Sequence, residues 1–303
     1  MAASYSVGVG DGAMMQKRVK LDFEIDFTNG GGIQGQDFRL DIASDDISDR
    51  DLAEAIVADL RLLMVAEAHI LKKEIIAEPH KRPADAGYVD LSHTIHDGLV
   101  TYRGLPAPVI CDYLSREESR THYAPGTEFQ IGKIEMISNT GTYVDCPFHR
   151  YAEGKDLSEV DLQRFADLPG IVIRADYREG LAVTAEPFKN RVLTDWAVLI
   201  HTGWAAHWGT EAYFGEHPFL TEDAAAYLRD SHVGLVGIDS MNIDDTRGGA
   251  RPVHSILLGA EILVVEHLCN LQNVPDQGFR FSAVPPKFKA VGTFPVRAFA
   301  RLG

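Results

Sequence analysis

The sequence predicts an α/β protein in which a small ββα module precedes a larger main domain. From Tyr88 onward, short apolar runs typical of buried strands alternate with stretches of helical periodicity. Ahead of that region, one stretch alternates apolar and polar residues as a half-buried strand does, and another repeats its apolar residues at helical spacing. We expect the module, with a mobile tail and a linker, to occupy residues 1–84 and the main domain residues 85–303.

The N-terminal residues predict a tail followed by a β-hairpin. Residues 1–16 are rich in Gly, Ala and Ser and show no period, which is typical of a mobile tail. Residues 20–27 place an apolar side chain at every second position and predict a strand. The glycine-rich run 28–36 predicts a turn and residues 38–42 a second strand. A phosphate-binding loop is the weaker interpretation of this run, because it lies between two strands and lacks the required glycine spacing.

A helix should complete the module. Ser48 is a candidate N-cap with Asp51 three residues later, and apolar residues then recur at helical spacing to about Lys72. Residues 77–87 carry prolines and a glycine among charged residues, so they predict a linker to the main domain.

The main domain shows the alternation expected of an α/β protein. A helix is expected over residues 221–230, with Thr221 as its N-cap. Four apolar runs predict buried strands, at residues 171–175, 197–201, 234–238 and 262–266.

The composition favours a globular protein that binds a small molecule. Hydrophobic residues make up 45% of the chain and charged residues 24%, as is ordinary for globular domains. The net charge of −15 argues against nucleic acid or an anionic membrane surface as a partner, because both are bound through basic patches. Apolar runs are too short to span a bilayer and the N-terminus lacks a signal pattern, so we expect a cytoplasmic protein.

The three cysteines, Cys111, Cys146 and Cys269, are odd in number and widely spaced. They form no CxxC pair, so neither a disulfide framework nor a thiolate zinc site is expected. Cys146 is interpreted as a small packing residue, because its sequence neighbours supply no base that would activate a thiol.

Polar residues cluster first in NTGTYVDCPFH, at 139–149. If this segment is extended, Asn139, Tyr143 and Asp145 point to one side, so that an amide, a phenol and a carboxylate converge on one cleft. A proline then turns the chain, which lets His149 approach the same point. The segment therefore contains candidate site residues.

A second cluster lies at residues 254–267. Glu266 closes an apolar strand, and a carboxylate at the end of a buried strand is a frequent site position in α/β proteins. His254 lies before a short predicted helix that leads into this strand. On this segment alone, the alternative that Glu266 merely starts a surface loop stays open.

Together, these segments resemble the sequence pattern of a known protein family. NTGTYVDCPFH resembles the HxGTHxDxPxH motif of the cyclase family, which includes bacterial kynurenine formamidase, isatin hydrolase and related metal-dependent amide or lactone hydrolases. The resemblance covers about residues 88–300. Further matches in chain order are DLSHTI at 90–95, LIHTGW at 199–204, VGIDS at 236–240, the spacing of His254 and Glu266, and GTFPVRAFA at 292–300.

The resemblance implies a compact swivelling-type β/β/α domain, usually assembled as a homodimer or homotetramer. It also implies one or two divalent metal ions, commonly Zn or Mn. Carried over to this sequence, the resemblance implies that Asp145 is the ligand aspartate and His149 the acid/base histidine. It also implies that His254 is the histidine of the second metal and Glu266 the metal-bridging glutamate.

The sequence departs from the family motif at two ligand positions. Asn139 and Tyr143 stand where the motif has histidine. Asn is a weak neutral donor, and Tyr binds metal well only as phenolate. We therefore expect the first metal position to be empty, while Asp145, His254 and Glu266 hold one divalent ion or none.

The leading hypothesis is hydrolysis of an amide, cyclic amide or lactone bond in a small molecule, with His149 as the general acid/base. Without an ion, Asn139 and Tyr143 would donate hydrogen bonds to the developing oxyanion. Trp204 is a candidate for lining an apolar pocket and Ser240 for shaping its wall. Two alternatives remain open: ring closure or dehydration by the same residues, and a catalytically weak scaffold protein.

Overall fold

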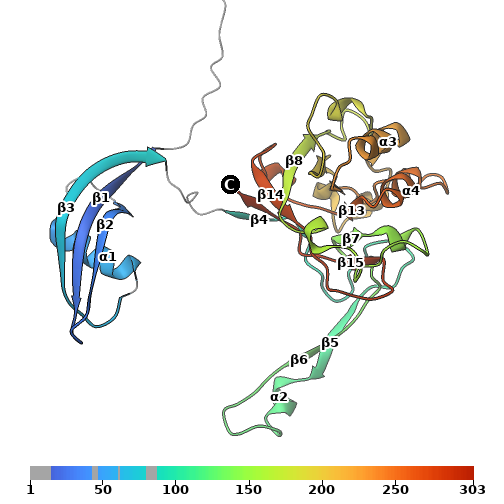
Figure 1. Ribbon diagram of the computed structural model, residues 1–303. Helices are drawn as coiled ribbons and strands as arrows, with labels where there is room; N and C mark the ends of the chain where they lie inside the picture. The colour runs from blue at the N-terminus through green and yellow to red at the C-terminus, as the bar shows by residue number, and fades with distance from the viewer. Residues whose placement is uncertain (1–14, 43–46, 61, 80–86) are drawn as a thin grey trace, which may run out of the picture. The chain divides into compact units, whose positions relative to one another are not determined.

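The computed structural model describes residues 15–42, 47–60, 62–79 and 87–303. It divides into two compact units, Met1–Asp85 and Ala86–Gly303 (Figure 1). Residues 1–14 of the expected tail and 80–86 of the expected linker lie outside the described residues. Within the described ranges, no helix combines the length and apolarity needed to cross a membrane.

The N-terminal unit is a three-stranded antiparallel sheet with one helix against it. The strand order is β2-β1-β3, and the expected hairpin forms between β1 and β2. Leu21 and Phe23 of β1 are buried against Leu52 and Ile56 of the helix. The elements are β1 (Met15–Phe27), β2 (Gly32–Asp41), α1 (Asp49–Asp59) and β3 (Val65–Pro79).

The prediction of a helix that reaches Lys72 is correct for residues up to Asp59 and wrong beyond them. The Ser48 side chain caps α1 by accepting from the Asp51 N–H at 3.1 Å, as predicted. The helix ends at Asp59, and Met64 takes a left-handed φ of 62°, which a continuing helix excludes. The following residues form β3, because pairing along β1 outweighs a local apolar spacing that also fits a helix. The module is therefore ββαβ.

The predicted α/β class is confirmed in the larger unit. Its nine-stranded sheet has the order β15-β7-β13-β12-β10-β8-β14-β16-β4. The four predicted strands correspond to β8, β10, β12 and β13, which run parallel. The sheet contains β4 (Tyr88–Asp90), β7 (Tyr143–Asp145), β8 (Leu168–Arg174), β10 (Ala197–His201), β12 (Leu235–Ile238), β13 (Leu263–Glu266), β14 (Phe279–Ser282), β15 (Thr293–Pro295) and β16 (Phe299–Leu302). Outside it lie β5 (Val109–Leu114), α2 (Arg116–Ser119), β6 (Ile131–Glu135), β9 (Ala182–Val183), β11 (Phe219–Leu220), α3 (Glu222–Asp230) and α4 (Pro252–Gly259).

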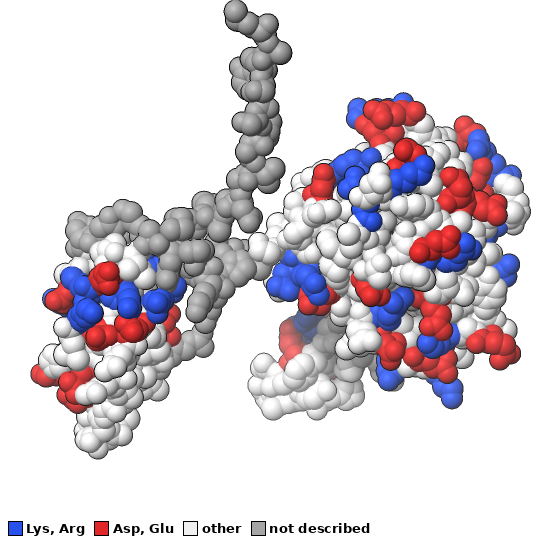
Figure 2. Space-filling model, turned by 45° about the horizontal axis from the view of Figure 1, so that its top comes forward, with Lys and Arg blue, Asp and Glu red and all other residues white. Residues whose placement is uncertain are grey.

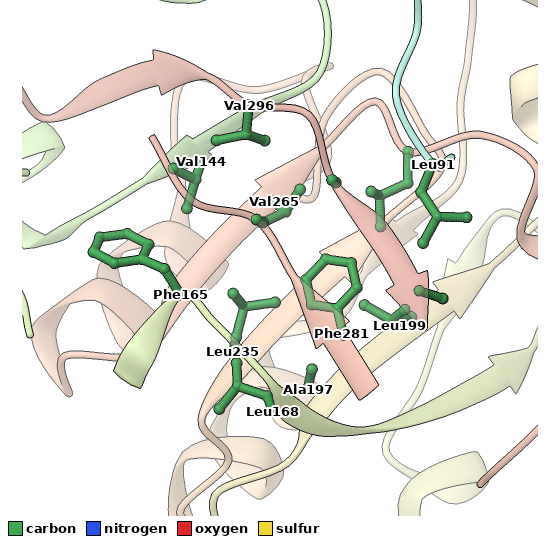
Figure 3. Packing of buried hydrophobic residues seen from close by; sticks show 14 of the residues in the cluster. Leu91, Val144, Phe165, Leu168, Ala197, Leu199, Leu235, Val265, Phe281 and Val296 are labelled. Carbon is green, nitrogen blue, oxygen red and sulfur yellow. The ribbon is translucent and has the colours of Figure 1, made fainter. Parts of the chain in front are cut away.

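Two hydrophobic layers sandwich the central parallel strands. On one face, Val198 and Ile200 of β10 pack with residues of α3 and α4. On the other face, Leu199 joins side chains from both ends of the sheet, among them Val144 and Phe281 (Figure 3). Because both ends contribute to one inner core, the sheet curls around it. The result is the β/β/α layering that the sequence led us to expect.

A hairpin arm, residues 109–135, extends from the larger unit (Figure 1). Its strands β5 and β6 pair only with each other among the described residues, with α2 between them. Large apolar side chains of the arm are solvent-exposed, including Phe129 and Ile134, the latter at 60%. A two-stranded ribbon is marginally stable by itself in water, so the arm presents a surface that further contacts would stabilise.

Surface charges are mixed rather than segregated. On the face of the larger unit seen in Figure 2, acidic and basic side chains are interspersed. Across the described residues of this unit, opposite charges also form pairs, such as Lys155 with Glu261, 2.7 Å apart, and Arg174 with Asp276, 3.0 Å apart. That face therefore offers no broad basic field.

Candidate functional site

The site is built where β7 lies between β13 and β15. In these antiparallel pairings, Tyr143 stands opposite Glu266 and Asp145 stands opposite Thr293. Directly opposed residues in a sheet bring their side chains into contact. Strand pairing alone therefore assembles four polar side chains from three distant parts of the sequence.

His149 is brought to the site by a short 3-10 turn, Pro147–His149, that follows β7. The Cys146 N–H donates to the Gly292 carbonyl at 2.8 Å, which ties this turn to the start of β15. A Cβ at Gly292 would lie 2.3 Å from the His149 backbone nitrogen, closer than packed atoms allow. Glycine at this position therefore permits the close approach of β15 to the turn.

A hydroxyl links His149 to Asp145. Thr293 Oγ1 donates to Asp145 Oδ1 and lies 2.7 Å from His149 Nδ1. Since the hydroxyl proton goes to the carboxylate, the Thr293 oxygen accepts from His149 Nδ1–H. In the neutral ring, Nε2 then carries the lone pair. The network therefore fixes the tautomer in which Nε2 can act as a base.

His254 lies in α4 and is 6% exposed. Its Nδ1 lies 2.6 Å from Asp244 Oδ2, while its Nε2 lies 3.6 Å from both Asp145 Oδ2 and Glu266 Oε1. Burial disfavours the charged ring, but the nearby Asp145 carboxylate, the hydrogen bond with Asp244 and the charge of Glu266 outweigh it and raise the pKa of His254 to about 10.

The donor set around Asp145 fits a divalent cation. Asp145, His149 and His254 each offer a ligand atom, and these atoms all lie within 4.8 Å of one another. Asp145 Oδ2 is buried and has no hydrogen-bond partner among the described residues. Two ligands about 2.1 Å from an ion stand roughly 3.4 Å apart in tetrahedral geometry, close to the 3.6 Å between Asp145 Oδ2 and His254 Nε2. An ion between them would satisfy the orphaned oxygen.

Tyr143 does not replace the missing histidine as a ligand. Its hydroxyl donates to Glu266 Oε2 at 2.6 Å. Burial, and then the nearby charge of Glu266, raise the pKa of Tyr143 well above its ordinary value, so the side chain stays a neutral phenol. Glu266 Oε1 accepts from the Ile243 N–H at 2.7 Å, and burial raises the pKa of Glu266 to about 7. A hydrogen bond between a phenol and a carboxyl group therefore joins β7 to β13 beside the cluster.

These groups border a cavity of about 670 Å³. Five predicted site residues line it, namely Asn139, Tyr143, His149, His254 and Glu266. Asp145, another predicted site residue, lies in the ligand cluster described above. The cavity is large enough for a small aromatic or alicyclic molecule.

Trp204 and Ser240 are not among the residues that line this cavity. The Trp204 indole N–H donates to the Tyr213 carbonyl at 3.2 Å, and the side chain is 7% exposed. The Ser240 hydroxyl donates to the Pro218 carbonyl at 2.7 Å and is fully buried. The structure therefore does not support the predicted substrate contacts: both side chains are satisfied within the core.

The segment 139–149 is extended over a shorter stretch than predicted. Only Tyr143–Asp145 forms a strand, and Gly141 has a left-handed φ of 67°. A Cβ there would also lie 2.7 Å from Ile95 Cγ1. Asn139 reaches the cavity through this bend and not through strand alternation.

Four further polar residues belong to the site and were not predicted. Thr293 and Asp244 orient the two histidines. The Tyr102 hydroxyl lies 3.0 Å from that of Tyr143 and accepts from Asn242 Nδ2 at 3.0 Å. Thr293 lies in the GTFP stretch that matched the family and could have been found there. The other three lie far from the site motifs or carry no local pattern.

Comparison with known proteins agrees with the fold and the motif. The family model described as Putative cyclase matches residues 89–245. Kynurenine formamidase of Geobacillus thermodenitrificans is 28% identical over 217 residues, which span 71% of this chain and 97% of the relative. Kynurenine formamidase of Bacillus cytotoxicus is 26% identical over 214 residues, with the same shares of the two chains.

Solved structures share the fold of the larger unit. Isatin hydrolase A from Labrenzia aggregata, bound to benzyl benzoate, has a TM-score of 0.62 at 22% identity and covers 71% of this chain and 93% of that chain. A predicted metal-dependent hydrolase from Bacillus stearothermophilus has a TM-score of 0.55 at 24% identity, covering 71% and 97%. With the family model matching more than half of its length, the chain belongs to the Putative cyclase family.

Proposed function

We propose that this protein hydrolyses an amide, cyclic amide or lactone bond of a small molecule in the cavity beside β7. The observation that carries the proposal is Asp145 Oδ2, which is buried, accepts no hydrogen bond from the described residues, lies 3.6 Å from His254 Nε2 and belongs to one cluster with His149. A buried carboxylate oxygen without a partner is costly, and such a group is retained where a cation or substrate completes it. The relatives named formamidase and isatin hydrolase support bonds of this type.

His149 is the proposed general acid/base. Thr293 holds its Nδ1–H, so that Nε2 is the atom that can take a proton from water. The imidazolium formed in this step then returns the proton to the leaving nitrogen or oxygen. The His149 side chain is about one third exposed, at 35%, so water and substrate can reach it.

Asp145, His254 and Glu266 are the proposed ligands of one divalent ion. When bound, the ion would polarise the substrate carbonyl. Asp244 holds His254 Nδ1 and thereby aims Nε2 at the ligand position.

Asn139 is the proposed donor to the substrate oxygen. Its Oδ1 accepts from the Ser138 hydroxyl at 3.2 Å. Because Asn139 lines the cavity, its amide N–H groups are then left for the substrate. Tyr143 was expected to share this role, but its hydroxyl proton is held by Glu266. We therefore assign Tyr143 to binding Glu266 and lining the cavity.

The proposed function is tested with a panel of aryl formamides, cyclic imides and lactones. We expect turnover of at least one class, and His149→Ala should lower kcat/KM by about 10²- to 10⁴-fold, the usual contribution of general acid/base catalysis. His96→Ala is the matched control, because His96 is exposed and does not line the cavity. Full turnover by His149→Ala would show that the acid/base assignment is wrong.

We also propose that the protein works as a homo-oligomer whose copies associate through the hairpin arm, residues 109–135. Exposed apolar side chains along β5 and β6 favour a contact there, and a two-fold axis lets two identical arms cover each other. Light scattering should give a multiple of 33.4 kDa, which Ile134→Lys reduces. Leu162→Lys, an exposed apolar residue outside the arm, should leave the mass unchanged. A monomeric wild-type protein would contradict this proposal.

A further inference from the structure

We propose that the substrate carries a carboxylate, and that Arg150 and Arg251 at the cavity bind it. This inference rests on the proposed hydrolysis and deepens it, because it names the class of substrate. Both arginines line the cavity that also contains His149 and His254. Neither was singled out by the sequence motifs.

The two arginines differ from most others in the larger unit. Arg174 and Arg297, for example, lie 3.0 and 2.9 Å from the carboxylates of acidic neighbours. Among the described residues, no carboxylate lies within ion-pair distance of Arg150 or Arg251. In a chain with 44 acidic and 29 basic residues, two arginines without an acidic partner beside one cavity point to an anion that arrives with the ligand.

Both guanidinium groups are held in place by neutral partners. Arg150 Nε donates to the Ser255 hydroxyl at 3.1 Å, and its guanidinium stacks 5.3 Å from the centre of the Tyr151 ring. Arg251 Nη1 donates to the backbone carbonyls of Gly248 at 2.8 Å and Ala250 at 2.7 Å. Within the part of the chain that the structure describes, the other N–H groups of both side chains make no further hydrogen bond, so they are available to a ligand. Because the side chains are already positioned, binding costs little conformational entropy.

Negative side chains lie deep in the cavity, whereas the two positive side chains lie at its rim. Asp145 and Glu266 are almost completely buried, whereas Arg150 is exposed and Arg251 half-buried. Arg150 adjoins His149 in the chain, so the guanidinium and the proposed base belong to the same turn. A small substrate can thus place its scissile bond at the histidines and its anionic group at the rim. The acidic interior disfavours the reverse orientation.

The geometry favours a carboxylate over a phosphate. A phosphate site commonly uses the free N–H groups at a helix N-terminus. At α4 these groups are occupied, because Asp244 accepts from the Val253 N–H at 2.7 Å and the His254 N–H at 3.1 Å. Planar guanidinium groups bind carboxylates and phosphates alike, so the occupied N-terminus of α4 is what favours the carboxylate.

The test measures binding separately from turnover. Calorimetry would compare benzoate with benzamide, which has a similar shape and no charge. We expect the wild-type protein to bind benzoate at least about tenfold more tightly, and the double variant Arg150→Gln/Arg251→Gln to lose that preference without weaker benzamide binding. Arg191→Gln is the matched control, since the Arg191 Nε donates to the Pro187 carbonyl at 2.9 Å, has no other hydrogen bond to a described residue, and is not among the residues that line the cavity. Equal preferences in the wild type and the double variant would overturn the proposal, as would tighter binding of inorganic phosphate than of benzoate.

Turnover of 2-formamidobenzoate and formanilide then separates this inference from the proposed function. If neither compound is hydrolysed but benzoate binding depends on the two arginines, the carboxylate site stands and hydrolysis of such amides fails. If both are hydrolysed equally well and the double variant changes neither kcat/KM nor benzoate affinity, hydrolysis stands and the carboxylate site fails.

Discussion

Replacing Thr293 by Val should damage both the stability of the protein and its activity. Valine has nearly the same shape, so the change removes only the hydroxyl between His149 Nδ1 and Asp145 Oδ1. Thr293 is 2% exposed and Asp145 is fully buried, so water does not readily replace the lost bond. Asp145 Oδ2 already accepts no hydrogen bond from the described residues, and the substitution leaves the other oxygen without its donor as well.

The expected loss of stability follows from the charge of the Asp145 carboxylate that accepts the hydrogen bond. A hydrogen bond to a charged group contributes about 1.5–3 kcal/mol, so we expect the free energy of unfolding to fall by about 2 kcal/mol. The His149 ring would also lose the contact that fixes its tautomer. We expect kcat/KM to fall by about 10- to 100-fold, part of the usual contribution of general acid/base catalysis. Thr293→Ser keeps the hydroxyl and should remain close to wild type in both properties.

Urea unfolding followed by tryptophan fluorescence measures the stability change. The three tryptophans, Trp196, Trp204 and Trp208, all lie in the larger unit, so the signal reports on the unit that contains the site. Chelator-treated protein should be used, because a bound ion would stabilise Asp145 independently. Wild-type unfolding and wild-type kcat/KM in Thr293→Val would refute the link between His149 and Asp145.

Three further outcomes are expected. Because the pKa of His254 is raised to about 10, its ring is still protonated at pH 8 without an ion, whereas Glu266, with a pKa of about 7, is mostly ionised there. Binding of Zn²⁺ at pH 8 should therefore release about one proton and tighten as pH rises toward 10; titration in buffers of different ionisation enthalpy checks this. In native protein at pH 8, Cys111 should react with a thiol reagent while Cys146 and Cys269 stay protected. The last two are buried, and burial raises their pKa values to about 11 and 12. Mass spectrometry measures the labelling, and modification of all three cysteines would contradict this prediction. Phe281→Ala removes a fully buried ring from the inner core and should lower the free energy of unfolding by about 3–5 kcal/mol, whereas an unchanged urea midpoint would argue against that core.

Local sequence patterns predicted helices and strands best where the residues were compatible with only one type of element. The four central strands are continuous apolar runs too short for a buried helix, and all four are present. The stretch after Asp59 has apolar residues at a spacing that suits either a helix or a strand. Pairing with β1 decided between them, and that contact joins residues too far apart for any local window to contain both.

The candidate site likewise combines contacts that a local motif predicts with contacts that only the folded sheet creates. Asp145 and His149 lie four residues apart, so the motif fixed their proximity through a single turn. The hydrogen bond from Tyr143 to Glu266 spans 123 positions, and that from Thr293 to Asp145 spans 148. Both depend on the register of β7 against its two neighbours, in which a shift by one residue would turn each side chain to the opposite face.

The sequence by itself determined the family, the α/β class and the residue types that carry the chemistry, because these depend on composition, periodicity and a short motif. Tertiary structure alone decided that Tyr143 binds a carboxyl group and that Trp204 and Ser240 are core residues. It also decided that Arg150 and Arg251 share a cavity with His149 and His254. Sequence fixes what each side chain can do, whereas the register of paired strands and the packing of helices fix which side chains meet.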